Sequence, residues 1–118
     1  MRPIQEVRRE IQEAVAIHDA AALYQLADEL SASDESEAVA LNNYARGRAE
    51  FLHSNYDAAV EHFRRAMDAF GQLGMQLDVA VCTTALGVVY HQSGESGRSL
   101  EHFERATEMF AQLQDQEG

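Results

Sequence analysis

The chain repeats itself at an offset of 40 residues. Residues 44–73 laid over residues 84–113 share ten identities in thirty positions. The identical pairs are Ala45/Ala85, Gly47/Gly87, Glu61/Glu101, His62/His102, Phe63/Phe103, Arg65/Arg105, Ala66/Ala106, Phe70/Phe110, Gln72/Gln112 and Leu73/Leu113. Most of the apolar and small pairs fall at helical spacing, and a period of this length is typical of helical repeat architectures. The pattern therefore predicts a duplicated helical hairpin.

Short polar or glycine-containing breaks divide the whole chain into six predicted helices. The breaks lie at residues 18–19, 31–34, 54–55, 71–74 and 93–97. The first helix is expected from about Pro3 to Ile17, the second from Ala20 to Leu30, the fourth from Asp57 and the fifth from Leu77 to His91. Because the turns are short, consecutive helices are expected to form three antiparallel pairs.

The third helix carries its own start and stop signals. It is expected to begin after Ser33 or Asp34, because either side chain can accept hydrogen bonds from the free amides of a first helical turn. Glu37 follows Asp34 by three residues, as in a capping box. The helix is expected to end where Asn55 can adopt a left-handed conformation.

Apolar residues of the fourth and sixth helices alternate steps of four and three, which traces one stripe along a helix. The stripes are Ala59, Phe63, Ala66, Phe70 and Leu73, and 40 residues later Ser99, Phe103, Ala106, Phe110 and Leu113. The fifth helix is nearly apolar throughout and is expected to be the most buried. Gly47 and Gly87 interrupt helices that Ala would stabilise, so each is expected to mark a close approach of two helices.

Composition argues against several classes of partner. The formal net charge is −11, and all nine basic residues are Arg, so nucleic acid is an unexpected partner. Cys82 is the only cysteine and lies in an apolar run, which favours a small buried residue over a reactive thiol. The sequence has no membrane-spanning run and a polar, acidic N-terminus, so we expect a cytoplasmic location and no membrane association.

The spacing of small and aromatic residues resembles the tetratricopeptide repeat family. In the last repeat the residues that match are Leu86, Gly87, Tyr90, Ser99, Phe103 and Ala106. In the middle repeat they are Gly47, Phe51, Ala59, Phe63 and Ala66. The first hairpin fits less well, since residues 1–46 contain no glycine; Ala22 and Leu26 are taken as its second-helix counterparts. The period also exceeds the usual ~34 residues of the family.

The resemblance implies an all-α fold, a right-handed superhelical stack of about three antiparallel helix pairs. We expect one domain over residues 1–118, with a divergent first hairpin at 1–33, a second repeat at 34–74 and a third at 75–114. It also implies a non-catalytic module that binds a peptide, helix or protein and needs no cofactor. The alternatives are an N-terminal regulatory or sensor segment of a larger bacterial signalling protein and a self-assembly module.

By the same resemblance, outward positions of the first helix of each pair line a partner-binding groove. The implied positions are Leu41, Tyr44, Arg48, Phe51, Val81, Thr84, Val88 and His91. This mixture would suit a peptide or helix with an apolar side chain and one carboxylate to meet Arg48. Packing against a neighbouring helix or protomer is the competing interpretation of the same residues.

The five histidines do not predict a metal or a catalytic site. His62 and His102 lie one repeat apart, about 10 Å or more, which is too far for one zinc ion with ligands at ~2.1 Å. His18, His53 and His91 lie at predicted helix ends, where a partly charged imidazole favours free carbonyls. A phosphotransfer bundle is disfavoured because the chain has no Lys, and no nucleophile lies on a strained turn. We therefore expect no enzyme.

The last helix is expected to leave an apolar surface that something must cover. Solenoids usually close with a polar terminal helix, and none is expected after Leu113. The expected interface is Leu100, Phe103, Met109, Phe110 and Leu113, beside Thr107. A second copy would cover it in a homodimer, and further repeats would cover it in a longer protein.

Overall fold

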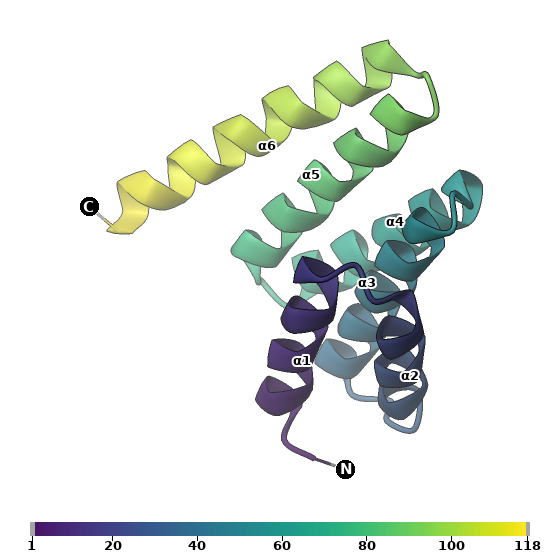
Figure 1. Cartoon of the computed structure of the whole chain (residues 1–118). Coiled ribbons are helices and arrows are strands. Elements are labelled where there is room, and N and C mark those ends of the chain that lie inside the picture. Colours follow the sequence, from purple (N-terminus) through teal and green to yellow (C-terminus); the bar gives the residue numbers. More distant parts are fainter. Residues whose placement is uncertain (1, 118) are drawn as a thin grey trace.

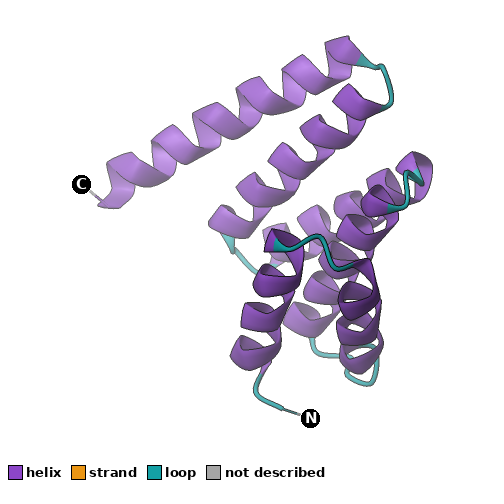
Figure 2. Ribbon diagram, viewed as in Figure 1, coloured by secondary structure: helices purple, strands orange, loops and turns teal. Residues whose placement is uncertain are grey.

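The computed structural model describes residues 2–117 and consists, over that range, of six helices without a strand (Figures 1 and 2). The helices are α1 (Ile4–Ala16), α2 (Ala20–Leu30), α3 (Ser36–Leu52), α4 (Tyr56–Gln72), α5 (Gln76–Gln92) and α6 (Ser96–Glu117). They form three hairpins, α1–α2, α3–α4 and α5–α6. The hairpins stack so that α1 and α2 lie at one end and α6 at the other (Figure 1). The predicted all-α stack of helix pairs is confirmed.

Two predicted details of α3 are wrong. The helix begins at Ser36 with Glu35 as its N-cap, so Asp34 and Glu37 form no capping box. The reason is that the Ser33 hydroxyl accepts a hydrogen bond from the Glu35 amide at 3.1 Å, which holds the loop open for two more residues. After the helix, the left-handed residue is Ser54 with φ 61°, one position before Asn55.

The left-handed residues between the two helices of each hairpin give the register of the stack. They are His18, Ser54 and Gly94, so the first hairpin aligns with the second at an offset of 36 and the second with the third at 40. At this register Leu23 and Ala27, which are fully buried, replace the predicted pair Ala22 and Leu26 as the counterparts of the later second-helix residues. The predicted register was wrong by one residue because that hairpin carries no glycine to fix it.

The close approach predicted at the two helical glycines is confirmed. A Cβ atom built on Gly47 would lie 2.8 Å from the Phe63 ring, and one on Gly87 would lie 2.8 Å from the Phe103 ring. In the first hairpin the equivalent residues are Ile11 and Ala27. There the large side chain belongs to the first helix and the small one to the second, so the hairpin closes without glycine.

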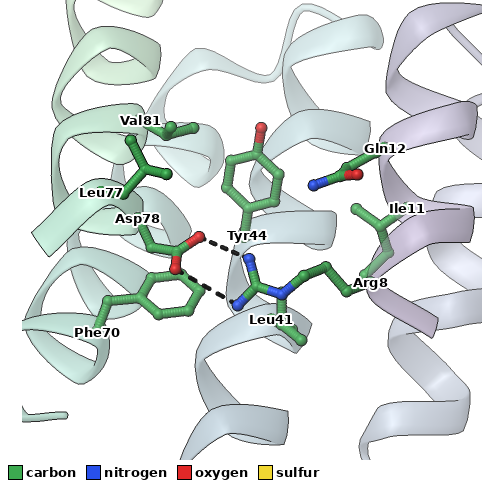
Figure 3. A pocket seen from close by; sticks show the side chains of 9 residues that line it. All are labelled: Arg8, Ile11, Gln12, Leu41, Tyr44, Phe70, Leu77, Asp78 and Val81. Carbon is green, nitrogen blue, oxygen red and sulfur yellow. Dashed lines mark hydrogen bonds and ion pairs between the residues drawn. The ribbon is translucent and has the colours of Figure 1, made fainter. Parts of the chain in front are cut away.

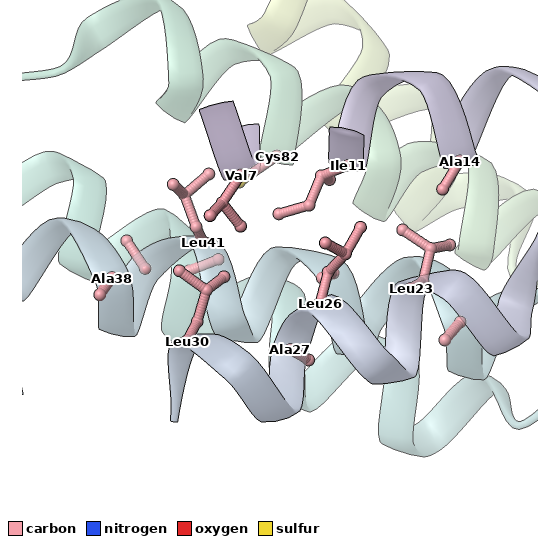
Figure 4. Close-up of a cluster of buried hydrophobic side chains, with 14 of the residues drawn as sticks. Val7, Ile11, Ala14, Leu23, Leu26, Ala27, Leu30, Ala38, Leu41 and Cys82 are labelled. Carbon is pink, nitrogen blue, oxygen red and sulfur yellow. The ribbon is translucent and has the colours of Figure 1, made fainter. Parts of the chain in front are cut away.

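The core forms two clusters of buried side chains. One joins all three hairpins and includes Leu23 of α2, Leu41 of α3 and Cys82 of α5 (Figure 4). The other lies around Phe63 and Leu86, between α4 and α5. Eight residues of α5 are buried, against six of α3, which confirms that the fifth helix lies deepest.

Candidate functional site

A cavity of about 230 Å³ lies between α1, α3 and the start of α5, where the first helices of the three hairpins face one another (Figure 3). Its walls are mainly apolar. The lining side chains are Arg8, Ile11, Gln12, Leu41, Tyr44, Phe70, Leu77, Asp78 and Val81. The side chains thus come from all three hairpins, and the cavity exists only because the hairpins are stacked.

Helical spacing brings these residues to one surface. Leu41 and Tyr44 are three residues apart on α3, and Arg8 and Gln12 are four apart on α1, so each pair shares a helix face. At the structural offset of 36, Arg8 takes the position of Tyr44. The groove therefore continues onto α1, with Arg8 in the position of Tyr44 and Gln12 in the position of Arg48.

One corner of the cavity is closed by an ion pair between residues 70 positions apart. The Arg8 guanidinium donates to the two carboxylate oxygens of Asp78 at 2.7 and 3.4 Å. It also lies 3.9 Å from Glu37 and 5.8 Å from the centre of the Phe70 ring. Arg8 is only 19% exposed and Asp78 21%, so this pair is shielded from salt more than a surface pair would be. It ties α1 to α5 directly (Figure 3).

Tyr44 forms the middle of the wall. Its ring packs against Phe63 with centroids 5.9 Å apart, and its hydroxyl points away from the Arg8–Asp78 pair (Figure 3). Burial raises the pKa of Tyr44, while the nearby Arg48 guanidinium opposes that shift. The hydroxyl is therefore neutral at physiological pH and can donate a hydrogen bond to a ligand.

Three of the eight predicted groove residues line the cavity, namely Leu41, Tyr44 and Val81. Arg48, Thr84 and Val88 are half-buried outside it, and His91 is exposed. Phe51 packs instead on Tyr56 of the next helix, with ring centroids 6.1 Å apart.

Sequence reasoning missed most of the cavity's polar residues. Arg8, Gln12 and Asp78 were not predicted to line it, because neither α1 nor the start of α5 carries a repeat signature. The structural offset of 36, applied to Tyr44 and Arg48, identifies Arg8 and Gln12. Asp78 was identifiable from its place in the first turn of an otherwise apolar helix.

The histidines lie apart from the cavity lining and serve as local contacts. His62 Nδ1 lies 3.0 Å from Asn43 Oδ1 across the second hairpin, and burial lowers the pKa of this imidazole. His102 Nδ1 donates a hydrogen bond to the Arg98 carbonyl oxygen at 2.8 Å, and the His53 ring stacks on Tyr24 with ring centroids 5.9 Å apart. Burial raises the pKa of Cys82 to about 12, so its thiol stays protonated.

The fold and the groove define the class of helical repeat proteins, in which stacked helix pairs present a surface rather than a catalytic centre. A family model described as tetratricopeptide repeat matches residues 36–112. The chain belongs to the tetratricopeptide repeat family, whose members generally act as protein-interaction modules without catalytic activity. A comparison with curated proteins finds no match. None of the helices within residues 2–117 has the length and hydropathy of a membrane span.

Proposed function

We propose that the chain binds a peptide or helix that inserts one large apolar side chain into the cavity between α1, α3 and α5. The cavity volume is the observation that carries this proposal. An apolar cavity of about 150 Å³ is large enough to bind benzene. The present one, at about 230 Å³, has room for an aromatic or leucine-sized side chain.

The groove beside the cavity also offers a cation. Arg48 lies one helical turn beyond Tyr44, is half-buried, and has no ion-pair partner among residues 2–116. A half-buried guanidinium without a counter-ion gains most from a carboxylate held in a fixed position. A partner with an acidic residue near its apolar anchor would supply that carboxylate.

The absence of Trp from the chain makes a direct test possible. Short synthetic peptides with one Trp are titrated with the protein, and insertion into the cavity is expected to shift Trp emission to shorter wavelength. Leu77→Asp puts a charge at the cavity mouth and should weaken binding about tenfold or more. Leu77 is 58% exposed, so the fold should tolerate the change.

Ile17→Asp is the matched control, since Ile17 is 72% exposed and lines no part of the cavity. Binding that Ile17→Asp leaves unchanged and Leu77→Asp removes supports the proposal. Emission that stays unshifted for all peptides, or equal effects of the two variants, contradicts it.

A second candidate function, self-association through α6, is supported by the repeat itself. Val60 and Met67 of α4 pack on the cluster that includes Leu86 of α5. Forty residues later, Leu100 of α6 is 59% exposed. The α4 aromatics Phe63 and Phe70 are each 1% exposed, whereas their counterparts Phe103 and Phe110 are only half-buried.

The opposite end of the stack is unsuited to cover this surface. A shallow groove between α1 and α2 is lined by Glu10, Glu13 and Glu29, of which Glu10 and Glu29 pair with Arg2. Head-to-tail stacking would therefore bury charged groups against Leu100. A two-fold contact between two α6 helices avoids that cost. Met109 lines a surface groove together with Met67 of α4, within the protein's own surface. The proposed interface therefore narrows to Leu100, Phe103, Phe110 and Leu113.

Light scattering at micromolar concentration tests this second candidate. The expected result is a dimer mass that Leu100→Glu converts to a monomer and that Ile17→Glu leaves unchanged. Leu113→Glu, at a half-buried position nearer the end of α6, should have the same direction of effect. A monomer mass for the unmodified chain would refute self-association through α6.

A further inference from the structure

The groove face of α3 has a charge polarity. Its outward positions, spaced by four, three and four residues, are Glu37, Leu41, Tyr44 and Arg48. This spacing keeps them in one stripe, with a carboxylate at the first position and a guanidinium at the last. Eleven residues at 1.5 Å separate the two charges by about 16 Å along the helix axis. The cavity lies between them.

The acidic end carries more negative charge than the protein neutralises. Among the ion pairs of the described residues, Arg8 is the cation that faces both carboxylates, Asp78 at 2.7 Å and Glu37 at 3.9 Å. The second distance is beyond hydrogen-bond length. Glu37 Oε2 is buried and has no hydrogen-bond partner among the described residues. A buried carboxylate oxygen without a donor costs free energy that an added cation would recover.

The Glu37 side chain lies at the edge of the groove, although its Oε2 atom is buried. Glu37 occupies in α3 the position that Leu77 occupies in α5 at the offset of 40, and Leu77 lines the cavity. The Glu37 side chain is 26% exposed, so it is neither sealed in the core nor fully hydrated. A partner cation beside the apolar anchor would approach the exposed part of this side chain rather than the buried Oε2.

We infer that the groove selects a segment by charge order, with a basic residue at the Glu37–Asp78 end, a large apolar residue in the cavity and an acidic residue at Arg48. This inference rests on the proposed function of the cavity. Because an extended peptide rises about 3.3 Å per residue and points every second side chain to the same face, two charges that both reach the groove about 16 Å apart correspond to residues four or six positions apart. The apolar anchor lies nearer the basic residue, since Arg8 and Asp78 line the cavity and Arg48 does not.

The probe peptide is acetyl-Arg-Ala-Trp-Ala-Ala-Ala-Glu-amide, in which the three side chains share one face of an extended chain. Its neutral control replaces both charged residues by Gln. Double-mutant cycles pair each peptide charge with one protein charge. Removing the peptide Arg should weaken binding about tenfold to the unmodified protein and hardly at all to Glu37→Gln. Removing the peptide Glu should do the same with Arg48→Gln.

The crossed pairs are the decisive control. The peptide Arg with Arg48→Gln, and the peptide Glu with Glu37→Gln, should show no coupling. Glu61→Gln, an exposed position on α4, should couple to neither charge. Circular dichroism checks the fold of each variant, and Asp78→Asn replaces Glu37→Gln if that variant unfolds.

The charge order and the binding function of the cavity are refuted by different results. A neutral peptide that binds with shifted Trp emission but shows no coupling to either charge refutes the charge order and leaves the cavity function standing. Coupling only in the crossed pairs means the opposite charge order and refutes the inference as stated. If neither peptide shifts its emission, both the charge order and the proposed function are wrong.

Discussion

The first hairpin and the two later hairpins pack their two helices together with the large and the small residue exchanged between the helices. In the later hairpins a glycine on the first helix receives a phenylalanine from the second, Gly47 with Phe63 and Gly87 with Phe103. In the first hairpin Ile11 takes the glycine position and Ala27 the phenylalanine position, and both are at most 1% exposed. The shared requirement is the combined volume of the pair, since interiors are close-packed. The glycine and phenylalanine pair of the family is therefore one of at least two residue combinations that let two helices pack closely in this chain.

The largest expected effect on stability comes from adding a side chain at the glycine position while the phenylalanine ring opposite it stays in place. Gly87→Leu adds a side chain where even a Cβ atom would lie 2.8 Å from Phe103, so we expect loss of the cooperative fold. Thermal melting followed by circular dichroism measures it. Gly97→Leu is the matched control, because a Cβ there meets nothing within 4 Å. A Gly87→Leu melt within a degree or two of the parent would show that the close approach is not required.

The second effect comes from removing the ring. Phe63→Ala opens a cavity beside Gly47, and Phe63 is 1% exposed, so the free energy of unfolding should fall by about 3–5 kcal/mol. Phe103→Ala at the equivalent position should cost less, because Phe103 is half-buried. Urea denaturation of both variants makes the comparison. Equal losses would mean that Phe103 is covered in solution, as self-association through α6 would do.

The third expected effect concerns a double variant in which the second hairpin receives the residue pair of the first. Gly47→Ile alone should be strongly destabilising, because the new side chain meets the Phe63 ring. Combined with Phe63→Ala it recreates the pair Ile11 and Ala27, and part of the loss should be recovered. We expect a coupling of about 1–3 kcal/mol in the double-mutant cycle. If the two losses simply add, the two hairpins differ in backbone spacing as well as in side chains.

The same comparison explains how much of the fold the sequence predicts. The offset of 40 and the stripe through Phe63 and Phe70 predict the later hairpins well, and the bounds of α5 differ from prediction by one residue at each end. In the first hairpin the offset is 36 and the small and large residues are exchanged. A search for the same residues at the same spacing cannot find it.

The candidate site, like the first hairpin, was predicted only in part from the sequence, but for a different reason. Leu41, Tyr44 and Val81 follow from the repeat pattern, because they occupy regular outward positions. Arg8 and Asp78 meet only because three hairpins curve toward one another, and 70 residues of chain separate them. Local periodicity contains no information about that curvature, so a contact between the first and last hairpins is visible only in three dimensions.

The smallest expected effect concerns the turns that align the hairpins. The first two turns place His18 and Ser54 in the left-handed region with φ of 57° and 61°, whereas the third uses Gly94 with φ 86°. Left-handed backbone costs a residue with a Cβ roughly 1–2 kcal/mol, and glycine avoids that cost but loses more conformational entropy on folding. Ser54→Gly should therefore raise the free energy of unfolding by about 0.5–1 kcal/mol.

Ser93→Gly is the control for Ser54→Gly, since Ser93 caps α5 with φ −85°, where glycine relieves no left-handed strain. There the entropic loss remains, together with the loss of the hydrogen bond that Ser93 Oγ donates to the Tyr90 carbonyl at 3.1 Å. Ser93→Gly should leave stability unchanged or lower it slightly. Urea denaturation of both variants shows whether each raises or lowers the free energy of unfolding, provided that this free energy depends equally on urea concentration in the two variants. Because Ser54 is exposed and its side chain forms none of the described hydrogen bonds, Ser54→Gly changes only two backbone terms, the relief of left-handed strain and the larger loss of conformational entropy. If both variants lower stability, the left-handed turn of the second hairpin carries no measurable strain, and the serine there is as suitable as the glycine of the third.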